Sequence, residues 1–400
     1  MTTLGGWADT ANDVLPNSLK FTLPPQSTAI QRRTLTEYFA TGASLYKPSG
    51  QRVIRISLTD AVNWLVPDSV ALKFTLSNDT GTNIVLADGV HSLISSVRVF
   101  CAGVPVEDAQ QFNKTSAMYQ KFVPENQVEQ LFTGKKGSTV GANSSMECIM
   151  PFSNTSLGFC RSDKYFPLRY AQVLFEITLI SDGADAFTTG NAGDWSISNP
   201  VIVCEKVQLD EDSEASVASH LAAGKSLPLM IDQLFSTTSA LTGTGAVNIN
   251  VSRSISRLSA IWVTFSETND KPTWFPNPGE TLELSARIGS DNIPDRPLRD
   301  RSMMLYSTLL GMGMMKPGNA LHTLPITQAQ YEGATNDNSA FIVRLSCEKE
   351  DSYALTGAPD LAAGALVTLS LKNASAAAVN CHLAYTTLVE ISSSGCQVME

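Results

Sequence analysis

The feature that most constrains this chain is a long succession of short apolar and β-branched runs, each closed by turn-forming residues. RVIRISL at residues 52–58 places Ile54, Ile56 and Leu58 on one face, and VALKFTLS at 70–77 repeats the alternation before the turn-rich NDTGTN. A side-chain period of two between such breaks indicates half-buried strands. Similar runs lie at 93–100, 171–180, 196–209, 227–235, 245–255, 257–265, 281–289, 339–347, 365–373 and 380–392. Many short strands joined by turns predict β-sandwiches or barrels.

Two stretches break the strand pattern and recur about half a chain apart. Residues 106–122 and 298–313 space their apolar side chains as a helix does. Each stretch follows a strand-like run and a proline, Pro105 or Pro297, which we expect near the helix start. Pro297 follows Pro105 by 192 residues, close to half of the 400-residue chain. A strand, a turn and a helix that recur once in each half predict a duplicated domain.

The length indicates two domains or one unusually large sandwich, because 400 residues exceed what one hydrophobic core usually holds. The duplication favours two domains. We predict an N-terminal arm at residues 1–27, a first domain at 28–212, a connector at 213–226 and a second domain at 227–400.

The connector contains SHLAAGKSLPL at residues 219–229, which raises the question of a phosphate-binding loop. Such a loop needs a glycine five residues before Gly224, where this chain has Ser219, and it should follow a strand and open a helix. We instead predict a short helix capped by Asp212 or Ser213, ended at Gly224, with Lys225 at its negative dipole end. A nucleotide-hydrolysing protein that uses Lys225 is therefore the weakest hypothesis.

The search for other chemistry nominates no catalytic, cofactor-binding or metal site. Four scattered histidines and the absence of a CxxC pair give no metal-ligand spacing. Cys381 and His382 are adjacent on a predicted strand and so point to opposite faces, which disfavours a catalytic dyad. The acidic run at 210–214 lacks the glycine and distal glutamate of a calcium loop. WFPNPGE at 274–280 concentrates aromatic residues and could stack on a sugar or a base through Trp274.

Composition limits the partners and the compartment. Twenty-eight basic and 38 acidic residues give a net charge of −10, which disfavours a broad nucleic-acid surface. No stretch has the length and apolarity to span a bilayer, and the N-terminus lacks the pattern of a signal peptide. Seven scattered cysteines set among apolar residues predict free buried thiols in a reducing compartment.

Six segments carry a resemblance to a known family. They are EYFATGASLYKPSGQRVIRISL (37–58), LADGVHSLISSVRVFCAGVPVED (86–108), YFPLRYAQVLFEITL (165–179), WSISNPVIVCEKVQLD (195–210), HLAAGKSLPL (220–229) and CHLAYTTLVEISSSG (381–395). In their order they resemble the double jelly-roll major capsid proteins of the adenovirus lineage, found in DNA viruses of eukaryotes, virophages and Polinton-like elements. The chain is shorter than many members, which implies that the tower loops of larger relatives are absent.

The resemblance implies a mainly β fold of two tandem eight-stranded jelly-roll sandwiches, each with a short helix. It also implies a viral major capsid protein without catalysis, whose homotrimer forms a pseudo-hexameric capsomer of an icosahedral shell. The implied partners are the chain itself, neighbouring capsomers, and penton and minor or cement proteins, without sequence-specific nucleic acid. The implied location is the virion, after synthesis in the host cytoplasm and assembly inside the host cell. The alternative is a carbohydrate-binding or adhesin-like β-sandwich protein that uses residues 274–280.

Overall fold

The computed structural model describes residues 29–122, 134–189, 193–268, 271–315, 326–333, 339–348, 359, 361 and 366–399. The predicted arm at residues 1–27 lies outside these ranges. So does most of the sequence between 350 and 364, which is rich in small and polar residues.

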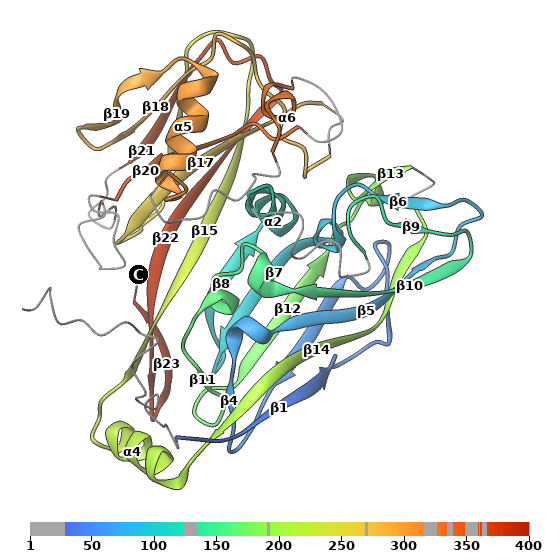
Figure 1. The fold of residues 1–400 in the computed structure, drawn as a ribbon, viewed down its shortest axis with the longest axis vertical. Coiled ribbons are helices and arrows are strands. Elements are labelled where there is room, and N and C mark those ends of the chain that lie inside the picture. The colour runs from blue at the N-terminus through green and yellow to red at the C-terminus, as the bar shows by residue number, and fades with distance from the viewer. Residues whose placement is uncertain are drawn as a thin grey trace, which may run out of the picture.

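The first half of the chain folds into two facing sheets (Figure 1). One sheet has the order β1–β14–β5–β10 and the other β3–β12–β7–β8, with all ladders antiparallel. The alternation of side chains along each strand explains why two sheets pack face to face. In β12, for example, every second residue is buried, so one face of the strand lies against the core. The main strands are β1 (Ile30–Phe39), β3 (Val53–Leu58), β5 (Ala71–Asn78), β7 (Ile94–Cys101), β8 (Val104–Gln110), β10 (Ser144–Pro151), β12 (Val173–Leu179) and β14 (Trp195–Leu209). Shorter strands are β2 (Leu45–Tyr46), β4 (Trp64–Leu65), β6 (Ile84–Leu86), β9 (Thr139–Val140), β11 (Phe166–Pro167) and β13 (Phe187–Thr189).

The second half repeats this arrangement. Its sheets have the orders β15–β22–β17–β20 and β16–β21–β18–β19, which match the first pair strand for strand. The strands are β15 (Leu227–Ala240), β16 (Val247–Val251), β17 (Leu258–Ser266), β18 (Glu283–Ile288), β19 (Asp291–Leu298), β20 (Ile342–Ser346), β21 (Val367–Lys372) and β22 (Ala378–Ser392), with β23 (Gly395–Met399) paired to β22. Two four-stranded sheets with this connectivity form a jelly roll. The predicted tandem jelly rolls are therefore confirmed.

A helix stands at the same place in each jelly roll. Helix α2 (Phe112–Gln120) follows β8, and α5 (Arg301–Gly311) follows β19. The predicted start of the first helix is wrong, because residues 104–110 form strand β8 and the helix begins only after Gln111, whose φ of 54° is left-handed. Pro105 and Pro297 lie in the outermost strands of their sheets, where an unpaired edge tolerates a residue without an N–H.

Helix α4 (Glu211–Ala222) connects the two jelly rolls. It begins earlier than predicted, because the side chain of Asp210 accepts a hydrogen bond from Ser213 N at 3.2 Å and so caps it. It ends as predicted at Gly224, which has a φ of 76°. The precise limits of the predicted domains, 28–212, 213–226 and 227–400, stay a prediction. Helix α6 (Gln328–Glu332) lies in the second half.

Each jelly roll has its own hydrophobic core, and the two halves also share side chains. The lower ends of β15 and β22 extend past the second jelly roll and run beside the first (Figure 1). There Leu229, Ile231, Val389 and Ile391 belong to the first core.

Candidate functional site

The residues that the sequence offered for chemistry serve structural roles. Lys225 lies after the end of α4 and before β15, so the strand–loop–helix order of a phosphate-binding loop is reversed. His382 is fully buried on β22, with Nδ1 2.8 Å from Ser236 Oγ and Nε2 3.4 Å from Thr264 Oγ1. Burial lowers the pKa of His382 to about 3, so the ring is neutral. Cys381 faces the second core on the other side of the sheet.

The acidic run and the aromatic stretch are also part of the architecture. Glu214 accepts hydrogen bonds from Trp64 Nε1 at 3.1 Å and Arg169 at 3.2 Å, which tie α4 to the first jelly roll. In WFPNPGE, Phe275 is fully buried between the jelly rolls, and Trp274 is half-buried. Among the described residues no group of three or more His, Cys, Asp or Glu side chains is placed to hold a metal ion.

The cysteines agree with the prediction that they are free and mostly buried. All seven are free, and six are buried. Burial raises the pKa of Cys148 and of Cys204 to about 12, which keeps both thiols protonated and unreactive.

The two jelly rolls meet at a seam, where α2 covers the outer face of sheet β15–β22–β17–β20. Trp262 on β17 faces α2, whereas its neighbours Ile261 and Val263 face the second core. The Trp262 ring lies 5.8 Å from the ring of Tyr119 and 6.1 Å from that of Phe122. The apolar seam consists of Ala117, Met118, Phe122, Leu234, Ala260, Trp262, Phe275, Ile342 and Ala384. Helix α2 is thus buried between two sandwiches (Figure 1).

Polar contacts fix the position of α2 on that sheet. Lys114 Nζ donates to Asn380 Oδ1 at 2.9 Å, and Thr238 Oγ1 donates to the same oxygen at 2.7 Å. Gln111 Nε2 donates to Thr238 Oγ1 at 3.0 Å. Burial lowers the pKa of Lys114 to about 8, which is the electrostatic consequence of enclosing an ammonium between two domains. Hydrogen bonds of this kind specify one orientation of the two jelly rolls.

A buried carboxylate lies at the lower part of the seam. Glu107 on β8 accepts hydrogen bonds from Gly158 N at 2.7 Å and Phe159 N at 2.8 Å. Its burial raises its pKa to about 7, although both N–H groups favour the ionised form. Gly158 in turn touches the backbone of Asp232 on β15, and a Cβ at this position would collide with it. The loop that Glu107 holds is therefore the surface on which β15 rests.

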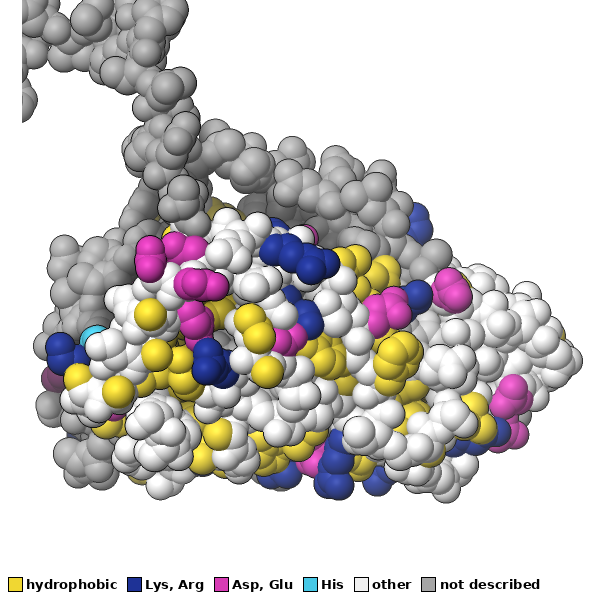
Figure 2. All heavy atoms as spheres, turned by 90° about the horizontal axis from the view of Figure 1, so that it is seen from below, with side chains coloured by type: hydrophobic (Ala, Val, Ile, Leu, Met, Phe, Trp, Pro, Cys, Tyr) yellow, Lys and Arg dark blue, Asp and Glu magenta, His cyan; other side chains and the backbone are white. Residues whose placement is uncertain are grey.

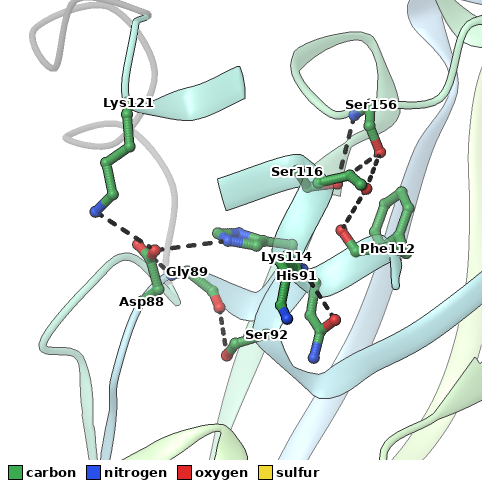
Figure 3. Close-up of polar contacts among 11 residues, drawn as sticks. Asp88, Gly89, His91, Ser92, Phe112, Lys114, Ser116, Lys121 and Ser156 are labelled. Carbon is green, nitrogen blue, oxygen red and sulfur yellow. Dashed lines mark hydrogen bonds and ion pairs between the residues drawn. The ribbon is translucent and has the colours of Figure 1, made fainter. Parts of the chain in front are cut away.

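A second set of polar contacts lies along α2 and just beyond its C-terminal end. Lys121 and His91 each lie 3.8 Å from the carboxylate of Asp88, and Ser116 Oγ lies 3.2 Å from Ser156 Oγ (Figure 3). Burial lowers the pKa of His91 even though Asp88 opposes this effect. These contacts anchor α2 to its own jelly roll, so the helix is held firmly against both.

Figure 2 shows one face of the molecule. Both acidic and basic side chains lie on it, with several acidic ones close together on one side, and hydrophobic side chains lie between them. In the part of the chain that the structure describes, no helix has both the length and the apolarity to cross a membrane.

Comparison with known proteins identifies the fold. No protein-family model and no curated protein matches the sequence. Among solved structures, a chain of the PBCV-1 virus capsid has a TM-score of 0.62 at 13% identity, covering 95% of this chain and 99% of that one. The Faustovirus major capsid protein has a TM-score of 0.60 at 8% identity, with coverages of 98% and 95%. The mavirus major capsid protein has a TM-score of 0.52 at 7% identity, with coverages of 97% and 93%. The fold of the chain is thus the double jelly roll of these capsid proteins, as the resemblance implied.

Proposed function

We propose that this chain is the major capsid protein of an icosahedral virus and that three copies form a capsomer with a pseudo-hexagonal outline. The observation that carries the proposal is the pairing, in one chain, of two jelly rolls with the same strand order. Three such subunits around an axis place six similar units in a ring, and such a ring can pack with six neighbours. This role depends on contact area and needs no catalytic group.

The proposal includes partners and a location. The chain associates with itself, with neighbouring capsomers, and with penton and minor or cement proteins in the virion, and it is synthesised and assembled in the host cell. Its net charge of −10 favours a shell that does not bind the genome through a broad basic surface.

Solution mass combined with electron microscopy of the purified chain tests the proposal. Three copies of the 42.9 kDa chain give a particle of about 129 kDa with a hexagonal outline, or closed shells. A monodisperse monomer at every concentration would contradict the proposal. In that case the glycan-binding alternative gains weight, and loss of saturable glycan binding in Trp274→Ala would identify it.

The predicted arm has its own test. Deletion of residues 1–27 is expected to leave trimers intact and to impair shell formation, since we propose that this arm lies under the shell or reaches a neighbour. Normal shells from the truncated chain would exclude this role for the arm.

A further inference from the structure

The two jelly rolls share a topology but differ in how one equivalent face is covered. In the second jelly roll, the outer face of β15–β22–β17–β20 is occupied by α2, and Trp262 on it is only 3% exposed. In the first jelly roll, the corresponding outer face belongs to β1–β14–β5–β10. Leu35 and Phe39 project from this face and are each 68% exposed.

The helices differ in the same way. Six of the nine residues of α2 are buried, whereas α5 buries only Met304 and Thr308. Met303, Tyr306 and Leu310 on α5 are 51%, 47% and 50% exposed. An amphipathic helix that exposes such side chains has an apolar face without a partner among the described residues.

These two surfaces account for most of the exposed apolar side chains. Of the twelve large hydrophobic residues exposed in the described part of the chain, seven lie on β1 or on α5 and the turn after it. They are Ile30, Leu35, Phe39, Met303, Tyr306, Leu310 and Met315. Single exposed apolar residues are normal on a protein surface. Two concentrations of them call for an explanation here, because α5 and β1 are the equivalents of α2 and β15, which form the two sides of the seam.

We infer that α5 of one copy seats on the outer face of β1–β14–β5–β10 of the next copy. This contact repeats between chains the contact that α2 makes within one chain. The duplication indicates why α5 is the element that binds there. Within the chain, the outer face is covered by α2, the helix that follows the outermost strand β8 of the other jelly roll. Helix α5 is its equivalent, because it follows the outermost strand β19. Such a contact is head-to-tail, so each copy offers its α5 to the next copy, and in the proposed trimer the third copy closes the ring. The inference rests on the proposed trimer.

A second contact of the seam predicts a second contact between chains. Within the chain, β15 lies beside β8, and Gln233 Nε2 donates to Val106 O at 2.5 Å. The equivalent strands are β1 and β19. Both are largely exposed and are outermost strands of their sheets. We therefore expect β1 of one copy to lie beside β19 of its neighbour.

Charge substitution on each surface tests the inference. Leu35→Glu on β1 and Leu310→Glu on α5 each place a carboxylate in the interface, and each should raise the protein concentration at half-dissociation of the trimer by roughly a hundredfold or more. Met399→Glu is the matched control, because Met399 is 44% exposed but lies on neither surface. The control should trimerise like the unsubstituted chain.

A mixing experiment tests the head-to-tail geometry. The Leu35→Glu chain keeps an intact α5, and the Leu310→Glu chain keeps an intact β1 face, so an equimolar mixture has one intact interface and should yield one-to-one dimers. Neither variant alone should do so. Trimers of normal affinity from both variants would overturn the inference while leaving the proposed function intact. An unsubstituted chain that never trimerises would overturn both.

Hydrogen–deuterium exchange of the unsubstituted chain keeps the test decisive if a variant fails to fold. On dilution from trimer to monomer, amides of β1, β19 and α5 should lose protection, whereas those of α2 should not. Unchanged exchange in β1 and α5 on dissociation would contradict the inference.

Discussion

The two jelly rolls have the same strand order, yet each depends on the other in a different way. The first completes its core with Leu229, Ile231, Val389 and Ile391, which come from the second half of the chain. The second contributes these residues and has its outer sheet covered by α2 of the first. The two halves therefore share their strand pairing but differ in which sheet faces and helices are buried. Each half is specialised for one side of the seam, so the two halves are expected to unfold as one cooperative unit.

The largest expected effect comes from removing the ring at the centre of the seam. Trp262→Ala should lower the free energy of unfolding by about 3–5 kcal/mol, because it leaves a cavity against Tyr119 and Phe122. Denaturant unfolding followed by circular dichroism measures this loss. We expect the variant to unfold in two steps, since the jelly rolls lose much of their contact.

The equivalent face of the first jelly roll supplies the control. Phe39→Ala should change the stability of the monomer by no more than about 0.5 kcal/mol, because most of this side chain is exposed. Similar losses for Trp262→Ala and Phe39→Ala would show that the two faces are equivalent in the monomer and would refute the comparison.

The next largest effect is a pH dependence that Glu107 gives to the first jelly roll. The folded pKa of Glu107 is raised to about 7 from 4.5, so the folded state holds this proton more tightly than the unfolded state. Its contribution is complete below about pH 4.5 and is lost as the pH rises to about 7, amounting to about 3 kcal/mol. Glu107→Gln should remove this slope, and the difference between the two unfolding curves measures it. Parallel curves from pH 4 to 8 would mean that Glu107 titrates alike in the folded and unfolded states, which would contradict the raised pKa.

Close approach at Gly158 gives a smaller effect. Gly158→Ala should cost about 1–3 kcal/mol, because the new Cβ would collide with the backbone of Asp232 and push β15 away from the first jelly roll. Gly81→Ala is a suitable control, since no atom lies within 4 Å of its added Cβ. Thermal unfolding of both variants measures the difference. Equal midpoints would show that β15 is not seated closely on this loop.

Much of the fold is predictable from the sequence, and the exceptions share a physical cause. Strands with one buried face, such as β3, β5 and β12, alternate clearly and were identifiable from period two. Strands β8 and β19 contain prolines and polar residues because they are outermost strands, and this composition hides them. Strand β1 is hidden for another reason: its large apolar residues Leu35 and Phe39 face outward, so its pattern is inverted.

The seam was much less predictable than the strands. Trp262 and Leu234 lie within apolar runs, and nothing in a single sequence distinguishes a side chain that faces its own core from one that faces the neighbouring jelly roll. The polar partners of α2 on the second jelly roll are separated from it by more than one hundred residues, as in the pair Lys114 and Asn380. The signal available in advance was the recurrence of strand, turn and helix in each half.

The smallest expected effect compares a hydrogen bond across the seam with one inside a single sheet. Thr238 Oγ1 joins Gln111 of the first jelly roll to Asn380 of the second, so Thr238→Val removes two hydrogen bonds and should cost about 0.5–1.5 kcal/mol. Thr368 Oγ1 donates to Asn250 on an exposed face of the second jelly roll, where valine suits the strand and water replaces the lost partner, so Thr368→Val should be nearly neutral. Urea unfolding of the two variants at one pH measures both changes. A larger loss for Thr368→Val would mean that this side-chain hydrogen bond within one sheet stabilises the molecule more than the hydrogen bonds of Thr238 at the seam.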